Sequence, residues 1–323
     1  MQKKKKNHYL PQFYLSRFAD IQQSRKGGKP VIWVYEKDKS ARMASPRNEA
    51  HENYFYSYED ESGATHSIED HLARIESVIA PMVRRLDESG YLPSVEERAE
   101  LAGFVALTFM RGPAARGFLD ALASRLMRKT AEDRAKDEVQ FAKDYDAVFG
   151  TKPTSVSKEE LRSSILSGEY ELRQGSRGFN LKMMMEATIW ITQALREYDW
   201  QILESDPGDI FLTTDVPVIT VLPDGAGRAT FGVGFGMPGV EVLFPVGTNI
   251  CLKLAAHQGN GRFRVPGAMV RQINKLEMAC ARRFVYASER STALEKLFSK
   301  MGCKVVYGEN ALLPNPAAPG FTG

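Results

Sequence analysis

Apolar residues recur every three or four positions through the middle of the chain, a spacing that predicts amphipathic helices. The predicted helices cover residues 67–89, 94–111, 113–126, 131–149 and 180–197. Helix starts are also marked by capping boxes, in which a serine precedes acidic residues two or three positions later. Three such boxes begin at Ser67, Ser94 and Ser157.

From Trp200 onwards the apolar period shortens to two, which predicts short strands. The predicted strands cover residues 200–203, 210–213, 216–221, 241–245, 250–255, 284–287 and 304–307, and one more lies early in the chain at 31–35. Helices are predicted between them over 270–281 and 294–300. Strands at both ends around a helical middle predict an α+β fold, with a mixed β-sheet built from N-terminal and C-terminal strands and a large helical insertion.

This pattern divides the chain into four regions. We expect residues 1–66 to hold the N-terminal motif and a strand of the β part, and residues 67–197 to form the helical region. Residues 198–310 are the β-rich C-terminal part, and residues 311–323 are a Pro/Gly/Ala tail that we expect to be mobile.

The N-terminus is unusually apolar for a chain end. Four lysines, Lys3 to Lys6, run directly into a block from Asn7 to Leu15 that holds three aromatic residues, two leucines and one histidine. Chain ends are usually polar, because ordering them costs entropy that few contacts offset. We therefore expect this block to be tied into the fold and to bring His8 and Gln12 with it.

Composition excludes several classes of protein. No apolar run approaches the roughly 20 residues that span a bilayer, and no apolar signal segment follows the basic start. The three cysteines are far apart and lack a C-x-x-C spacing, which argues against a disulfide framework and a cysteine-built zinc site. We expect a cytoplasmic protein with no membrane association.

The net charge of +3 conceals an uneven distribution. Residues 1–30 carry eight Lys/Arg against Asp20 alone, and residues 260–308 carry ten against three acids, so residues 31–259 are acidic on balance. Basic ends on an acidic body favour a polyanionic partner, nucleic acid or a nucleotide. The simpler interpretation is a solvated lysine tail and an ordinary mixed surface.

The block from Asn7 to Leu15, followed by Phe18 and Ala19, resembles the hallmark of an uncharacterised bacterial family, domain of unknown function 4238. Weaker matches follow in the same order, at Glu69, Glu76, Phe104, Arg111–Pro113, Trp200, Leu203, Phe211–Val218, Phe244, Pro245 and Asn274. The resemblance covers residues 6 to about 288. This chain has Val216 where the family typically has asparagine before the proline. The resemblance implies an architecture and candidate positions but no reaction.

His8 and Gln12 are the first candidates for chemistry. An imidazole with a pKa near 6.5 suits a general base or a metal ligand. Imidazole is equally common as a buried structural group, so the structural interpretation of His8 stays open. Gln12 lies four positions on and is a candidate for substrate binding.

Among the acidic residues, Asp215 is the strongest candidate for a functional role. It follows a predicted strand and precedes Val216-Pro217, and ligands often gather at strand ends. A carboxylate there could hold a metal ion or orient a histidine. The competing interpretation is that Asp215 accepts backbone hydrogen bonds in a turn.

Arg111 and Arg116 flank Gly112-Pro113, where one predicted helix ends and the next begins. Two guanidinium groups beside a helix N-terminus could bind a phosphate. Alternatively, Arg111 only complements the dipole at the C-terminal end of its helix. Asn274, in the basic helix near the C-terminus, is a further candidate for substrate binding.

These candidates lead to one hypothesis and two alternatives. The hypothesis is a hydrolase that cleaves phosphodiesters in nucleic acid or nucleotides, with His8 as base or metal ligand, Asp215 orienting it or binding a divalent ion, and Arg111 holding phosphate. No histidine and acid follow a known metal-ligand spacing, so the metal itself is unspecified. One alternative is a non-catalytic binding or sensing module in which His8 and Asp215 pin the N-terminus. The other is a small-molecule hydrolase with the same acid and base.

Overall fold

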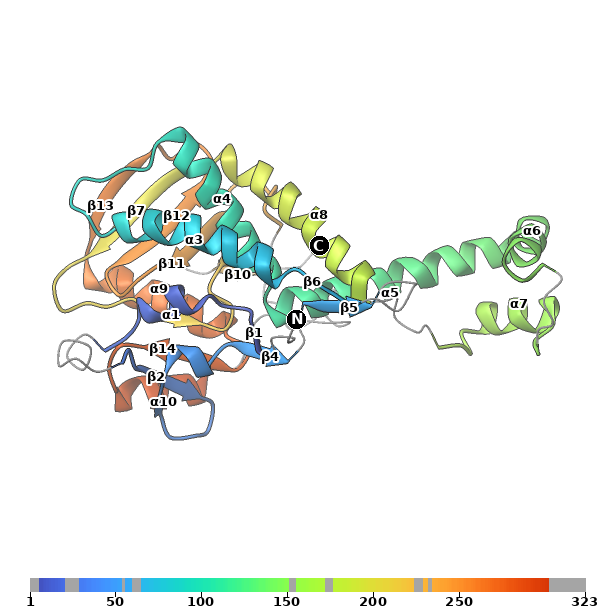
Figure 1. Ribbon diagram of the computed structural model, residues 1–323, viewed down its shortest axis with the longest axis horizontal. Coiled ribbons are helices and arrows are strands. Elements are labelled where there is room, and N and C mark those ends of the chain that lie inside the picture. Colours follow the sequence, from blue (N-terminus) through green and yellow to red (C-terminus); the bar gives the residue numbers. More distant parts are fainter. Residues whose placement is uncertain are drawn as a thin grey trace.

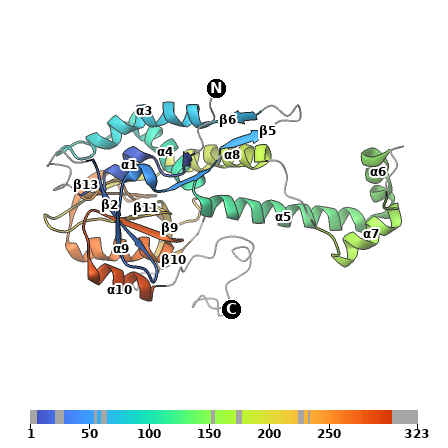
Figure 2. The same cartoon turned by 60° about the horizontal axis from the view of Figure 1, so that its bottom comes forward.

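A computed structural model describes residues 6–20, 29–53, 56–59, 65–150, 155–171, 177–223, 229–231 and 234–301. A layered α+β body carries a long helical arm that projects from one side (Figures 1 and 2). The predicted fold class is confirmed, with helices concentrated in the middle of the chain and strands from both ends. The predicted strand 304–307 lies outside the described residues.

The larger sheet comes from the C-terminal half. Its strands, in spatial order, are β10 (Ala229–Phe231), β9 (Ile219–Pro223), β11 (Glu241–Pro245), β12 (Ile250–Ala255), β7 (Asp199–Ser205) and β13 (Gly261–Val265). Neighbours are antiparallel except β13, which runs parallel to β7, so the sheet is mixed. Nearly every residue of β11 and β12 is buried, because both faces of the sheet are covered.

A second, antiparallel sheet joins the two ends of the chain. Its strands are β3 (Arg42–Ala44), β2 (Ile32–Glu36), β14 (Phe284–Ala287) and β8 (Thr213–Thr214). Two-stranded ribbons pair β1 (Lys6–His8) with β4 (His51–Asn53), and β5 (Ser57–Glu59) with β6 (Thr65–Ser67). A 3-10 turn, η1 (Pro46–Asn48), precedes β4. The one sheet expected from the sequence is therefore divided between separate sheets.

Helices cover both faces of the larger sheet. They are α1 (Gln12–Ser16), α3 (Glu69–Arg85), α4 (Val95–Met110), α5 (Pro113–Lys136), α6 (Glu138–Phe149), α7 (Lys158–Ser167), α8 (Arg177–Arg196), α9 (Gly267–Cys280) and α10 (Thr292–Lys300). On one face, α1, α3, α4 and α8 enclose the main core against β7, β11 and β12. On the other face, α9 packs Val270 and Ile273 against Leu243 and Cys251. No helix in these described ranges is long and apolar enough to cross a membrane.

Two of the three expected capping boxes are present. Ser94 and Ser157 each accept the backbone N–H three residues on, and the glutamate at that position accepts from the serine N–H in return. The box expected at Ser67 is wrong: Ser67 is the last residue of β6, and the N-cap of α3 is Ile68. The Ser67 hydroxyl accepts the backbone N–H of Glu69, two residues on, at 3.3 Å.

The arm consists of α5, α6 and α7. Its first helix has 24 residues and is therefore about 36 Å long. Figure 2 shows α6 and α7 at the far end of α5, away from the body. The far end buries little: α6 buries Phe141, and none of the residues of α7 is buried.

We expect the backbone amides of α6 and α7 to exchange with solvent much faster than those of α4. Exchange protection follows burial and local packing, and α4 buries half of its residues in the core. Hydrogen–deuterium exchange mass spectrometry of the whole chain measures this. Equal protection of α4 and α7 would contradict the expectation.

Candidate functional site

The N-terminal block is buried in the body. Tyr14 is fully buried, and its ring stacks on Phe244 with 5.3 Å between the ring centroids. The Tyr14 hydroxyl donates to the Pro245 carbonyl at 2.7 Å and therefore accepts from the Thr213 hydroxyl at 2.6 Å. These contacts reach more than 190 positions along the chain and hold the N-terminus, as the apolar pattern predicted.

Strand β1 carries His8 to the edge of the body. In the β1–β4 ribbon, His8 lies opposite His51, and the two rings meet edge to face with centroids 5.5 Å apart. The His8 Nε2 atom lies 3.0 Å from the Arg47 carbonyl. A carbonyl can only accept, so Nε2 carries the hydrogen, and Nδ1 of the neutral ring has a free lone pair.

The ring of His8 is half-buried, and burial lowers its pKa below the usual value. The nearby His51 and Arg111 lower the pKa of His8 further, whereas the Arg47 carbonyl and Glu76 oppose the shift. The neutral ring is therefore the main form at neutral pH.

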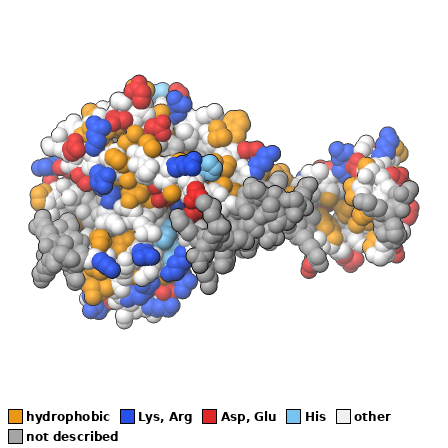
Figure 3. Space-filling view, viewed as in Figure 1, with side chains coloured by type: hydrophobic (Ala, Val, Ile, Leu, Met, Phe, Trp, Pro, Cys, Tyr) orange, Lys and Arg blue, Asp and Glu red, His pale blue; other side chains and the backbone are white. Residues whose placement is uncertain are grey.

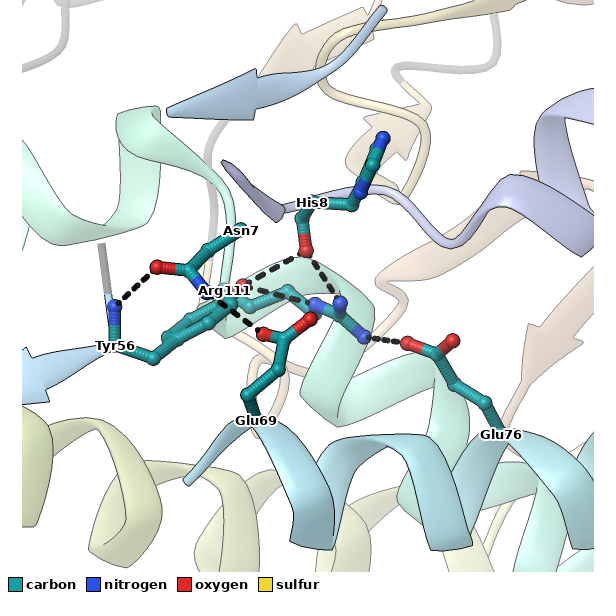
Figure 4. A network of polar contacts seen from close by, with 6 residues as sticks. All are labelled: Asn7, His8, Tyr56, Glu69, Glu76 and Arg111. Carbon is teal, nitrogen blue, oxygen red and sulfur yellow. Dashed lines mark hydrogen bonds and ion pairs between the residues drawn. The ribbon is translucent and has the colours of Figure 1, made fainter. Parts of the chain in front are cut away.

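Arg111, the C-cap of α4, holds the backbone of His8 (Figure 4). Its guanidinium donates to the His8 carbonyl at 2.5 Å, to Glu76 Oε1 at 2.8 Å and to the Tyr56 hydroxyl at 3.1 Å. The side chain is only 2% exposed. Burial alone would lower the pKa of Arg111, but Tyr56 and Glu76 raise it, so the buried group stays charged. Every nitrogen of this guanidinium has a partner inside the protein.

The same network reaches the neighbouring residue of β1. The Asn7 amide donates to Glu69 Oε2 at 3.1 Å, and its oxygen accepts from the Tyr56 backbone N–H at 3.5 Å. The Tyr56 hydroxyl donates in turn to the His8 carbonyl at 3.3 Å. Figure 4 shows Glu69 and Glu76 pointing from α3 toward β1, on the shared helical face that their spacing of seven implies.

Asp215 lies directly after β8, and its carboxylate is bound by backbone. The two oxygens accept the N–H groups of Arg282 and Arg283 at 2.9 and 2.8 Å, just before β14. Burial raises the pKa of Asp215 to about 6, although these backbone hydrogen bonds oppose the shift. Its charge acts on Tyr9, the residue after His8. In the described part of the chain, no hydrogen bond or ion pair joins Asp215 to His8 or Arg111.

The other sequence candidates lie apart from His8. Gln12 is exposed at the first residue of α1, and Arg116 is partly exposed in the first turn of α5. The Asn274 amide donates to the Ile210 carbonyl at 2.8 Å, and its oxygen accepts from the Leu212 N–H at 3.1 Å. Asn274 thus fastens the segment that leads into β8.

Sequence reasoning did not assign roles to His51 and Tyr56. The pairing of His8 with His51 spans 43 positions and depends on strand register, which no local spacing reveals. Within the described ranges, no group of three or more His, Cys, Asp or Glu side chains could hold a metal ion.

A second buried acid, Glu277, lies under the smaller sheet. It is fully buried on α9 and accepts a hydrogen bond from the Thr214 hydroxyl at 3.3 Å. Its Oε1 atom has no hydrogen-bond partner among the described residues. Burial raises the pKa of Glu277 well above its usual value and so favours the protonated carboxyl.

Because burial favours the neutral form of the Glu277 carboxyl, Glu277→Gln is expected to change the free energy of unfolding by less than about 1 kcal/mol at pH 7. By contrast, Glu277→Lys introduces a buried charge and is expected to prevent folding. Urea denaturation of the two variants measures the difference. A loss of several kcal/mol in the glutamine variant would show that Glu277 is ionised.

Comparison with known proteins identifies a family. Residues 6–291 match the family model described as "Protein of unknown function (DUF4238)". No curated protein matches, and no solved structure matches.

Proposed function

For this chain, which belongs to the DUF4238 family of unknown function, we propose from the setting of His8 a hydrolase that cleaves phosphodiesters in nucleic acid or nucleotides. The observation that carries this proposal is the imidazole of His8. It is half-buried, neutral and held in one tautomer by the Arg47 carbonyl. Such a ring can accept a proton from water at Nδ1.

The surroundings of His8 favour a positioned base. A general base works best when its ring and backbone are held in one geometry. The Arg47 carbonyl orients the His8 ring, and the Arg111 and Tyr56 side chains donate hydrogen bonds to the His8 carbonyl. In this proposal Arg111 positions His8 and does not bind phosphate, because its nitrogens are already engaged.

Basic side chains around His8 favour a phosphate-bearing substrate. Lys6 is exposed and lies two residues before His8 in β1, so both side chains share one face of the ribbon. Arg47, whose backbone carbonyl contacts the His8 ring, also has an exposed side chain. Figure 3 shows further Lys and Arg side chains on the lower part of the body, over β2, β14 and α10. Arg283 and Arg290 flank β14 in the sequence; they are 61% and 57% exposed and form ion pairs with Glu36 and Glu295.

The test is incubation of the purified protein with single-stranded DNA, RNA, duplex DNA and nucleotides, each with Mg²⁺ or Mn²⁺. We expect cleavage by the wild type and a loss of at least about 100-fold in His8→Ala, the usual contribution of a general base. The control is His71→Ala, which alters an exposed histidine of α3. Failure to cleave any of these substrates, or full activity of His8→Ala, would refute the proposal.

A second candidate function is a non-catalytic module that binds a polyanion. One observation favours it: the polar groups of Arg111, Asp215 and Asn274 form hydrogen bonds within the protein. This function predicts tight binding of oligonucleotides without cleavage. It also predicts that His8→Ala lowers the melting temperature substantially, whereas a catalytic His8 can be removed with little loss of stability.

A further inference from the structure

The pair of histidines at the β1–β4 ribbon has the geometry of a metal-binding pair. His8 and His51 are direct cross-strand partners in an antiparallel ribbon. Side chains at such positions start about 5 Å apart and point to the same face. The two rings are close, with centroids 5.5 Å apart, but edge to face, so they do not stack.

This spacing agrees with two imidazoles on one ion. A zinc–nitrogen bond of about 2.1 Å and a tetrahedral angle of about 109° place two coordinated ring centres roughly 5 Å apart. The observed centroid distance of 5.5 Å is close to this separation. We propose that His8 and His51 form a binding site for a single transition-metal ion that prefers imidazole, such as Zn²⁺, Co²⁺ or Ni²⁺.

The hydrogen bonds around the rings support this assignment. Because His8 Nε2 donates its hydrogen to the Arg47 carbonyl, the lone pair of Nδ1 is the one that can coordinate a metal ion. Histidines that bind metals typically use one nitrogen in this way while the other donates to a carbonyl or carboxylate. His51 Nδ1 is buried and has no hydrogen-bond partner among the described residues. A coordinated metal would satisfy this atom.

The protein supplies only part of the coordination shell. No third His, Cys, Asp or Glu joins the pair within the described ranges, so water or a substrate oxygen would complete a tetrahedral ion. Two imidazoles without a carboxylate favour Zn²⁺, Co²⁺ or Ni²⁺ over Mg²⁺, which prefers oxygen ligands. Lys6, two residues before His8 in β1, and Arg47 are both exposed, and their positive charges suit an anionic ligand.

This inference rests on the proposed function and deepens it, because it places a metal ion on His8, the residue that carries the proposed hydrolysis. A metal at His8 Nδ1 and a proton acceptor at the same atom exclude each other. Occupancy would therefore decide that His8 acts as a metal ligand and not as a general base. Binding itself can be measured without any activity.

The experiment uses the full chain without a histidine tag, freed of metals by a chelator. Calorimetry with Zn²⁺ and visible absorption with Co²⁺ are expected to show one bound ion per chain. His8→Ala and His51→Ala are each expected to weaken binding at least tenfold, and His71→Ala, on α3, to leave it unchanged. Because His51→Ala keeps the bond between His8 and Arg47, it remains informative if His8→Ala does not fold.

The outcomes separate the inference from the proposed function. Absence of binding at millimolar metal, or equal binding by wild type and His51→Ala, would overturn the metal site. Cleavage that persists in excess EDTA, together with absence of metal binding, would leave the hydrolase in place and overturn the metal site. Binding of one ion that depends on both histidines, without cleavage of any substrate, would support the metal site and refute the hydrolase.

Discussion

Replacing Arg111 with alanine is expected to lower the free energy of unfolding by about 3–5 kcal/mol, the usual cost of removing one partner of a buried ion pair. The guanidinium is 2% exposed and binds Glu76, the Tyr56 hydroxyl and the His8 carbonyl. Its removal leaves the Glu76 carboxylate without its arginine partner and leaves the His8 carbonyl with the Tyr56 hydroxyl as its donor. Chemical denaturation at pH 7 measures the loss.

Two matched variants sharpen this prediction. Arg84→Ala removes an exposed arginine of α3 and is expected to cost less than about 0.5 kcal/mol. Arg111→Lys keeps the charge but cannot reach three acceptors with one ammonium group, so we expect it to recover only part of the loss. If Arg111→Ala is as stable as Arg84→Ala, the hydrogen bonds of Arg111 to His8, Glu76 and Tyr56 do not contribute to the stability of the fold.

Replacing Asp215 with alanine is expected to cost roughly 4 kcal/mol near pH 4, because two buried backbone N–H groups lose their acceptor at about 1–3 kcal/mol each. These are the N–H groups of Arg282 and Arg283, which start β14. Loss of these two hydrogen bonds is expected to destabilise the pairing of β14 with β2, which joins the two ends of the chain in the smaller sheet.

The cost of Asp215→Ala is also expected to depend on pH. The pKa of Asp215 is about 6 in the folded protein, against 3.8 for an ordinary aspartate, so the folded state holds the proton more tightly. The stabilisation by Asp215 is therefore complete below pH 3.8 and is lost as the pH rises through 6. The change is up to about 3 kcal/mol, since each pKa unit corresponds to about 1.4 kcal/mol.

The charge of Arg282 lowers the pKa of this carboxyl, and Asp215 in turn raises the pKa values of the buried phenols of Tyr9 and Tyr286. Denaturation of wild type and Asp215→Ala at a series of pH values from 4 to 7.5 isolates the effect, because other carboxyl groups titrate equally in both. A difference that grows with pH would show that the pKa of Asp215 is lowered by its backbone donors.

Local patterns in the sequence predicted most of the elements. The strand at 284–287 is observed with the same bounds, and the helices expected at 94–111 and 180–197 appear as Val95–Met110 and Arg177–Arg196. These segments are long or strongly periodic, and their caps lie within a few residues. The short strands β1, β4 and β13 were not predicted, because they contain few apolar residues.

The candidate site, like the fold, was predicted only in part. His8 and Asp215 stand out in the sequence because each interrupts an apolar segment with a group that can titrate. Their partners do not stand out. Arg111 was expected to bind a phosphate, but α3 and β1 bring Glu76 and the His8 carbonyl to it and occupy its donors.

The sequence by itself determined the α+β composition, the anchored N-terminus and the membership in the family, because each depends on composition or on order along the chain. Only the tertiary structure decided which polar groups meet. His51 reaches His8 across 43 positions, and Arg283 reaches Asp215 across 68. Contacts over such separations depend on strand register and helix packing, which are settled by the burial of the whole core and leave no mark on local spacing.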